Sequence, residues 1–176
     1  SGLLSGREIS AKFIGDNSLS GRPMNRIIDP LTQMGVDIKS NRGFLPIEIS
    51  PNNLKGITYS PPTASAQVKS AILLAGLGAQ GKTVVIERIK TRDHTELMLA
   101  EMGAHLSTIR ENISIKPLDR PLKTFELTVP GDPSSAAFFG ALAAITPNSN
   151  ITIKNILANP TRIGFFSTLK KMGAGI

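Results

Sequence analysis

The sequence contains no cysteine and no tryptophan, and its only aromatic residues are seven phenylalanines and one tyrosine. Without cysteine the chain can form no disulfide, no thiolate metal site and no cysteine nucleophile, and nothing points to an oxidising compartment. Its apolar runs are broken by Gly, Lys or Gln well short of the ~20 residues that a membrane-spanning helix needs. Its first residues do not resemble a basic-then-apolar leader. We therefore expect a soluble, cytoplasmic protein without a membrane partner.

Positive charge exceeds negative charge, with 20 Lys and Arg against 13 Asp and Glu and a net charge of +7. Such a surplus suits either nucleic acid or small anionic ligands. The basic residues are scattered singly, and no run of them alternates with aromatic residues as single-strand binders require. We expect small anionic substrates and no nucleic-acid partner.

A pattern of the form L-x-x-M-G occurs three times, at 31–35, 99–103 and 169–173. In each copy Leu and Met are three residues apart, on one face of a helix, and Gly stands where a left-handed C-terminal cap is needed. Each copy is therefore predicted to end a helix. The three methionines are predicted to lie in the core: Met34, Met102 and Met172.

Other segments recur with the same period of about 70 residues. Each helix that ends at L-x-x-M-G is preceded by a segment rich in β-branched residues, which predicts a strand. A second kind of helix is predicted at 65–77 and at 134–145, each starting with small hydroxyl residues. The predicted strands are 8–14, 82–88 and 149–155, and the predicted strand pairs lie within 36–50 and 105–118. One unit then reads strand, helix, two strands, strand, helix.

This period exceeds the 20–50 residues of simple solenoids, so we expect the units to pack around a common axis. Equivalent loops would then meet at one end. These loops carry Arg22 and Arg92, with Arg162 as the third equivalent, and they would face helix N-termini such as that at Ser65. Unpaired N–H groups and guanidinium groups together favour phosphate or carboxylate.

Five stretches carry a specific resemblance. They are "GDNSLSGRPMNRIIDPLTQMG", "ASAQVKSAILLAGL", "TRDHTELML", "VPGDPSSAAFF" and "NPTR". In this order they resemble the 5-enolpyruvylshikimate-3-phosphate (EPSP) synthase family, and the similarity runs through the whole chain. The patterns S-A-Q-x-K at 65–69, R-x-H-x-E at 92–96 and N-x-T-R at 159–162 resemble class II of the family, whose members tend to tolerate glyphosate.

The resemblance implies a transferase of the shikimate pathway of aromatic amino acid biosynthesis. It moves the enolpyruvyl group of phosphoenolpyruvate to the 5-hydroxyl of shikimate 3-phosphate without a metal or organic cofactor. The implied fold is α/β of the α+β type: βαβαββ units around a pseudo-threefold axis, in the inside-out α/β barrel of enolpyruvyl transferases. Residues 1–129 would hold two units of the N-terminal domain, and residues 130–176 would open the C-terminal domain.

The chain is then expected to be a fragment lacking both ends of the family's sequence, including its catalytic acid and base residues. We expect the full-length enzyme to be a monomer and this chain alone to be inactive. A core short of one unit is expected to expose apolar surface and to promote self-association. The residues expected to be exposed are Ile72, Leu73 or Phe138.

The resemblance also implies binding residues. Arg22 and Gln67 would bind phosphoenolpyruvate, and shikimate 3-phosphate would be bound by Ser65, Ala66, Gln67 and Arg92, with Ala66 contributing its backbone N–H. Ser65 also suits an N-cap, and the two roles can coexist.

Structural interpretations remain open for neighbouring residues. Arg92 could instead pair with Asp93 or Glu96. His94 is interpreted as ordering its loop and not as an acid or base, and Asp132 is interpreted as a helix cap.

Two other functions remain open at this point. The sister enzyme that transfers enolpyruvate to UDP-N-acetylglucosamine shares the repeated architecture, but it typically uses a loop cysteine. A non-catalytic anion-binding repeat module is the other alternative. The "SAQ" and "RDHTE" stretches favour the shikimate enzyme over its sister.

Overall fold

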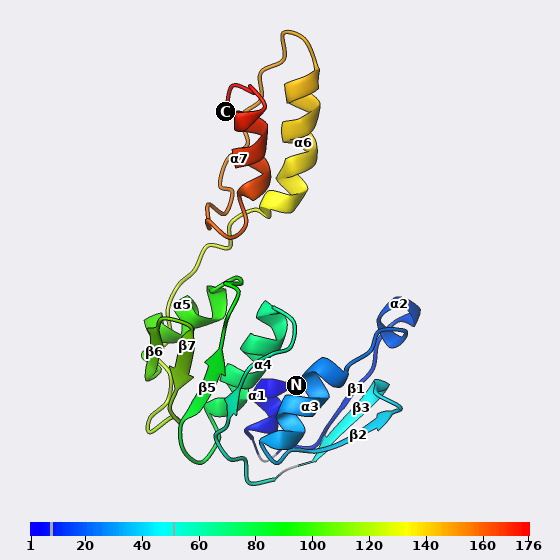
Figure 1. Ribbon diagram of the computed structural model, residues 1–176, viewed down its shortest axis with the longest axis vertical. Coiled ribbons are helices and arrows are strands. Elements are labelled where there is room, and N and C mark those ends of the chain that lie inside the picture. The colour runs from blue at the N-terminus through cyan, green and yellow to red at the C-terminus, as the bar shows by residue number, and fades with distance from the viewer. Residues whose placement is uncertain (8, 51) are drawn as a thin grey trace. The chain divides into compact units, whose positions relative to one another are not determined.

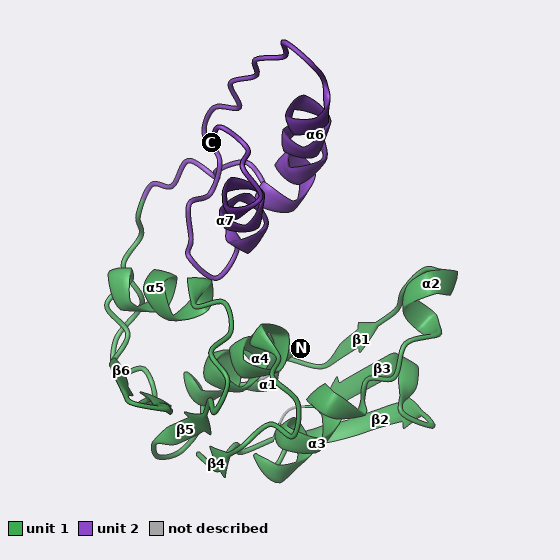
Figure 2. Cartoon of the chain, turned by 45° about the horizontal axis from the view of Figure 1, so that its top comes forward, with its two compact units in different colours: residues 1–125 green, residues 126–176 purple. Residues whose placement is uncertain are grey.

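A computed structural model describes residues 1–7, 9–50 and 52–176. The chain divides into two compact units, Ser1–Phe125 and Glu126–Ile176 (Figure 2). The first unit contains all the strands of the described residues, and the second unit contributes two helices (Figure 1).

The two sheets of Ser1–Phe125 share one strand order. In each sheet, the third of three consecutive strands lies between the first and the second. The order is β1-β3-β2 in one sheet and β5-β7-β6 in the other, and every pair within these triplets is antiparallel. The short β4 adds to the second sheet, parallel to β5. The strands are β1 (Ala11–Phe13), β2 (Asp37–Asn41), β3 (Phe44–Ser50), β4 (Thr58–Tyr59), β5 (Thr83–Ile86), β6 (Leu106–Ile109) and β7 (Asn112–Ile115). The repeated α/β unit predicted from the sequence is thereby confirmed.

The helix α4 is the central element of the first unit. It packs against α1, α3, β5 and β7, so that it contacts elements of both repeats. Residues on several of its sides are buried, among them Ile72 and Leu73, because neighbours surround it. The helices are α1 (Gly2–Ser5), α2 (Asn17–Ser20), α3 (Asn25–Gln33), α4 (Ala66–Gly76), α5 (His94–Glu101), α6 (Pro133–Ile145) and α7 (Gly164–Lys171).

The L-x-x-M-G pattern ends a helix in all three places, as predicted. The methionine is the C-cap of α3, α5 and α7 in turn. The glycine that follows has a positive φ, +99° at Gly35, +83° at Gly103 and +100° at Gly173. Residues with a Cβ rarely adopt this conformation, so glycine is the residue that allows the chain to leave each helix.

The prediction that all three methionines lie in the core is wrong for one of them. Met34 is fully buried and Met102 is half-buried, but Met172 is 77% exposed. In the described part of the second unit no sheet is present to cover α7, which packs against α6.

Other expectations from the sequence need correction as well. The strand predicted at 149–155 does not form, because a strand requires a partner and this stretch has only one isolated bridge beside it, between Gly131 and Ile156. The strand predicted at 8–14 is β1, and Glu8 lies outside the described residues.

The expected apolar exposure is found at one of the three positions. Ile72 and Leu73 have no exposed surface, so that expectation is wrong for them, whereas Phe138 on α6 is 79% exposed, as expected. The difference follows from location: α4 is enclosed by both repeats, whereas the described partner of α6 is α7.

A matched pair of substitutions tests this packing. Met34→Ala should lower the free energy of unfolding by about 2–5 kcal/mol, because a fully buried side chain is lost. Met172→Ala, in the same motif but exposed, should change it by no more than about 0.5 kcal/mol. Urea unfolding followed by circular dichroism measures both. Equal losses would contradict the burial described for these two residues.

Candidate anion-binding site

The N-terminus of α4 is capped by a neutral residue and carries no acid. Ser65 has an extended backbone, φ −151°, and its Oγ accepts a hydrogen bond from the N–H of Val68 at 3.4 Å. The N-cap role predicted for Ser65 is confirmed. No acidic residue stands in the first turn. The first N–H groups of a helix have no acceptor within it and are partly positive, so this turn favours an anion.

A cavity of about 400 Å³ lies beside this turn. It brings together three of the residues predicted to bind substrate, Ala66 and Gln67 from the first turn of α4 and Arg92 from the loop before α5. Its polar lining also includes Ser70 of α4 and His94 and Thr95 of α5. Ser65 lies on the rim of a separate cavity of about 310 Å³, which it shares with Lys69 and Glu87.

Arg22 is not among the residues that line either cavity. It follows α2, is exposed, and its N–H donates to the carbonyl oxygen of Leu19 at 3.1 Å. Arg26, which the sequence interpretation did not consider, lies closer to the site. Its Nη2 donates to Oε1 of Gln67 at 3.4 Å, from α3 to α4. Arg26 stands in the quoted stretch "GDNSLSGRPMNRIIDPLTQMG", which was the available signal.

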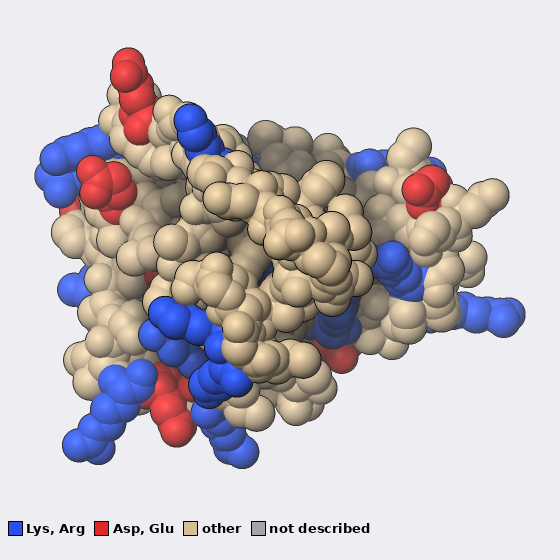
Figure 3. Space-filling model, turned by 90° about the horizontal axis from the view of Figure 1, so that it is seen from above, with Lys and Arg blue, Asp and Glu red and all other residues tan. Residues whose placement is uncertain are grey.

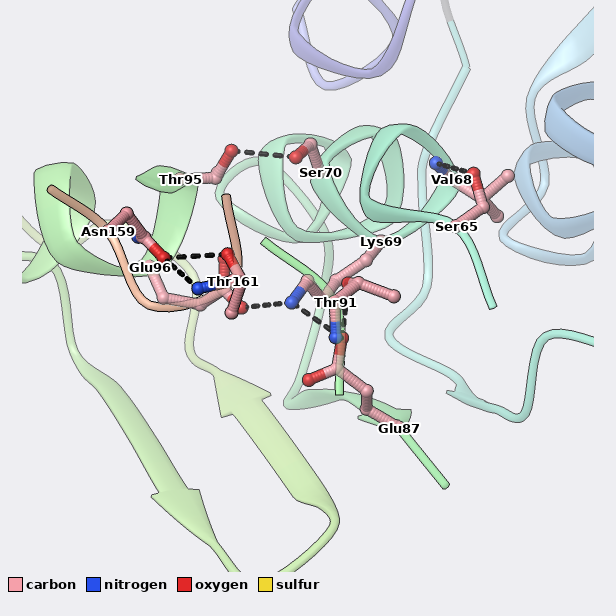
Figure 4. A network of polar contacts seen from close by, with 10 residues as sticks. All are labelled: Ser65, Val68, Lys69, Ser70, Glu87, Thr91, Thr95, Glu96, Asn159 and Thr161. Atoms are coloured by element: carbon pink, nitrogen blue, oxygen red, sulfur yellow. Dashed lines mark hydrogen bonds and ion pairs between the residues drawn. The ribbon is translucent and has the colours of Figure 1, made fainter. Parts of the chain in front are cut away.

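Glu96, the pairing partner considered for Arg92, binds Lys69. The Nζ of Lys69 lies 2.5 Å from Oε1 of Glu96 and 2.7 Å from Oε1 of Glu87 (Figure 4). The alternative in which Glu96 simply neutralises Arg92 is therefore not what the structure shows. Sequence reasoning missed Lys69 and Glu87 as a pair. Lys69 and Glu96 both stand in the quoted patterns S-A-Q-x-K and R-x-H-x-E, which were the available signal.

His94 lines the same cavity as Arg92. Its Nε2 is buried and has no hydrogen-bond partner among the residues that the structure describes. Its predicted role in ordering the loop stays a prediction.

The N-terminus of α6 provides a comparison within the same chain. Its N-cap is Asp132, whose Oδ1 accepts from the N–H of Ser134 at 3.1 Å, which confirms the predicted cap. Arg162, the repeat equivalent of Arg92, donates from Nη2 to Oδ1 of Asp132 at 2.8 Å and to Oγ of Ser134 at 2.7 Å. An internal carboxylate thus already occupies the place where an external anion would bind.

Charge elsewhere on the surface is dispersed. On the face shown in Figure 3, Lys and Arg side chains lie in several separate places with acidic side chains between them. Among the described residues, no group of three or more His, Asp or Glu side chains is placed to hold a metal ion. None of the described helices combines the length and the apolar character required to cross a bilayer.

An arginine and an acid-free helix N-terminus thus lie beside one cavity of a repeated α/β fold, an arrangement that favours an anion. Comparison with known proteins is specific about the family. The family model for EPSP synthase (3-phosphoshikimate 1-carboxyvinyltransferase) matches residues 1–176. The chain belongs to the EPSP synthase family.

Individual relatives agree with this assignment. The chain is 49% identical to a 3-phosphoshikimate 1-carboxyvinyltransferase of Endomicrobium trichonymphae and to one of Thermodesulfovibrio yellowstonii. All of this chain is covered in both alignments, but only 41% of each relative. The solved structure of EPSP synthase from Acinetobacter baumannii superposes with a TM-score of 0.84 at 45% identity, covering 99% of this chain and 40% of that one. The chain thus spans about two fifths of these proteins, and the UDP-N-acetylglucosamine alternative is not favoured.

The Asp132 cap predicts a pH dependence in the second unit. The backbone N–H of Ser134 and, after it, Arg162 lower the pKa of Asp132 below its ordinary value of 3.8. A lowered folded-state pKa means that the stabilisation is present above pH 3.8 and is lost as the pH falls through the folded-state value. The protection of the Ser134 amide from exchange, measured against an unstructured peptide at the same pH, should therefore fall below that pH. Asp132→Asn keeps a cap without the charge and should flatten the dependence; an unchanged profile in this variant would contradict the assignment.

Proposed function

We propose that this chain is part of a 3-phosphoshikimate 1-carboxyvinyltransferase. The full-length enzyme would transfer the enolpyruvyl group of phosphoenolpyruvate to the 5-hydroxyl of shikimate 3-phosphate and release phosphate. The observation that carries the proposal is the family match over the whole chain. It is supported by the cavity at which Ala66, Gln67 and Arg92 meet, because both substrates are anions.

The residues of the cavity have complementary roles in this proposal. The N–H group of Ala66 and the guanidinium group of Arg92 bind shikimate 3-phosphate, together with the hydroxyl of Ser65. Gln67 contacts both substrates, and Arg26 holds its side-chain oxygen in place. Arg22 binds phosphoenolpyruvate. No catalytic acid or base, metal or organic cofactor is assigned to this chain.

The proposal includes an assignment of the chain to domains. Residues 1–129 are two units of the N-terminal domain and residues 130–176 open the C-terminal domain. Two copies of one strand order within the first compact unit, which ends at Phe125, support this division. We also propose that the full-length enzyme is a cytoplasmic monomer.

A thermal-shift comparison tests the proposed function. Shikimate 3-phosphate should raise the melting temperature, whereas UDP-N-acetylglucosamine and a single-stranded oligonucleotide should not. A rise in melting temperature with UDP-N-acetylglucosamine alone would instead indicate the sister enzyme that uses this substrate.

The chain by itself should show no phosphate release from the two substrates. Light scattering should also show that it self-associates, through exposed α6 residues such as Phe138.

Arg22 provides a test at the level of one residue. In a full-length enzyme that contains this segment, Arg22→Ala should lower kcat/KM for phosphoenolpyruvate roughly 10- to 150-fold, because a charge-assisted hydrogen bond is lost. Arg120→Ala, which removes an exposed arginine that lines neither cavity, is the matched control. If Arg26→Ala causes the loss and Arg22→Ala does not, the phosphoenolpyruvate contact belongs to Arg26.

The first turn of α4 should divide its contacts between the two substrates. Gln67→Ala should raise the KM of both substrates, whereas Ser65→Ala should act chiefly on shikimate 3-phosphate. The two side chains diverge, since Gln67 lines one cavity and Ser65 the other. Steady-state kinetics with each substrate varied in turn measures this. Equal effects of both variants on both substrates would rule out the division.

A further inference from the structure

The side chain of Lys69 is the largest fully buried side chain of the described residues, with 1% of the residue exposed. Its ammonium group contacts two carboxylates, those of Glu87 and Glu96 (Figure 4). Burying charges is costly, and such a cluster could often be replaced by apolar side chains without loss of stability. Its presence beside a binding cavity therefore suggests a role beyond stability.

The two carboxylates belong to the two ends of one segment, residues 87–96. Glu87 directly follows β5, and Glu96 stands in the first turn of α5. Glu87 also binds the loop between them, because its Oε1 accepts from the N–H of Thr91 at 3.0 Å and from the Thr91 hydroxyl. Lys69 therefore fastens both ends of this segment to α4.

A second contact connects the same two elements one residue further along α4. The hydroxyls of Ser70 and Thr95 lie 2.6 Å apart. Lys69 and Ser70 of α4 thus both bind side chains of the segment 87–96. Arg92, within this segment, lines the cavity together with Ala66 and Gln67 of the same helix.

We propose that Lys69 is a positioning residue for substrate binding: its ion pairs with Glu87 and Glu96 hold Arg92 at the cavity beside the first turn of α4. The inference rests on the proposed function for the identity of the ligand, shikimate 3-phosphate. The fastening of the segment itself does not depend on that ligand. A loop arginine held in place loses less freedom on binding, which is how preorganisation increases affinity.

The first experiment measures the fastening without substrate. In the full-length enzyme, Lys69→Met should accelerate hydrogen exchange of the amides at 88–93 about tenfold or more, while the amides of β2 and β3 keep their rates. Lys12→Met is the matched control, because Lys12 also forms an ion pair, at 2.8 Å with Glu48, but on the exposed surface. Unchanged exchange at 88–93 in Lys69→Met would overturn the proposal.

The second experiment measures binding. Lys69→Met should raise the Kd of shikimate 3-phosphate by roughly tenfold, as when a supporting contact of a binding residue is removed. Ile49→Val, in the core of the first sheet, lowers stability without touching the cavity, so its Kd should stay within about twofold. If Kd follows the melting temperature in both variants, Lys69 is merely structural.

A milder variant covers the case in which Lys69→Met does not fold. Glu96→Gln keeps the size of the side chain and leaves Lys69 paired with Glu87, and it should give smaller changes of exchange and of Kd in the same direction. A wild-type enzyme that does not bind shikimate 3-phosphate would refute the proposed function. An enzyme that binds it, and is weakened by Arg92→Ala but not by Lys69→Met or Glu96→Gln, would refute the positioning role alone.

Discussion

The ammonium group of Lys69 is the buried charged contact that joins α4 to the segment between β5 and α5. The lysine belongs to α4, one of the carboxylates that bind it follows β5, and the other stands in the first turn of α5. One turn earlier, the same helix presents Ala66 and Gln67 to the cavity. The residues of α4 that line the cavity and the lysine that forms the buried ion pairs thus lie within one turn of the same helix.

Two helix N-termini of the same chain show how one residue decides whether an anion site is open. At α4 the cap is Ser65, a neutral side chain, and the arginine of the next loop, Arg92, lines the adjoining cavity. At α6 the cap is Asp132, and the equivalent arginine, Arg162, binds it directly. The carboxylate does there what a bound phosphate would do at α4. The two helix N-termini thus differ in charge, with a neutral cap at Ser65 and an acidic cap at Asp132.

Sequence patterns predicted the helix ends and strand pairs, which depend on residues close together in the sequence. Burial and the Lys69 ion pairs depend on contacts between residues far apart in the sequence. Helix ends at L-x-x-M-G followed from glycine at positive φ, and the strand pairs predicted within 36–50 and 105–118 form there. The motif did not predict burial. Met34 and Met172 occupy the same position in it, but only Met34 has a sheet to cover it. At the site, Ala66, Gln67 and Arg92 were predicted and meet at one cavity. The quoted patterns contain Lys69 and Glu96, but their pairing was missed because the two carboxylates that bind Lys69 lie beyond an intervening strand, where residue spacing does not indicate contact.

The parallel pairing of β4 with β5 has a consequence for how such a chain can change in length. β4 precedes α4 and hydrogen-bonds to β5, which follows that helix, so that β4, α4, β5, α5, β6 and β7 form one βαβαββ unit with a single four-stranded sheet. A break of the chain between β4 and α4 would leave β5 with an unpaired edge, whereas a break before β4 would keep this sheet complete. Such a unit can therefore be gained or lost as a whole more easily than in part.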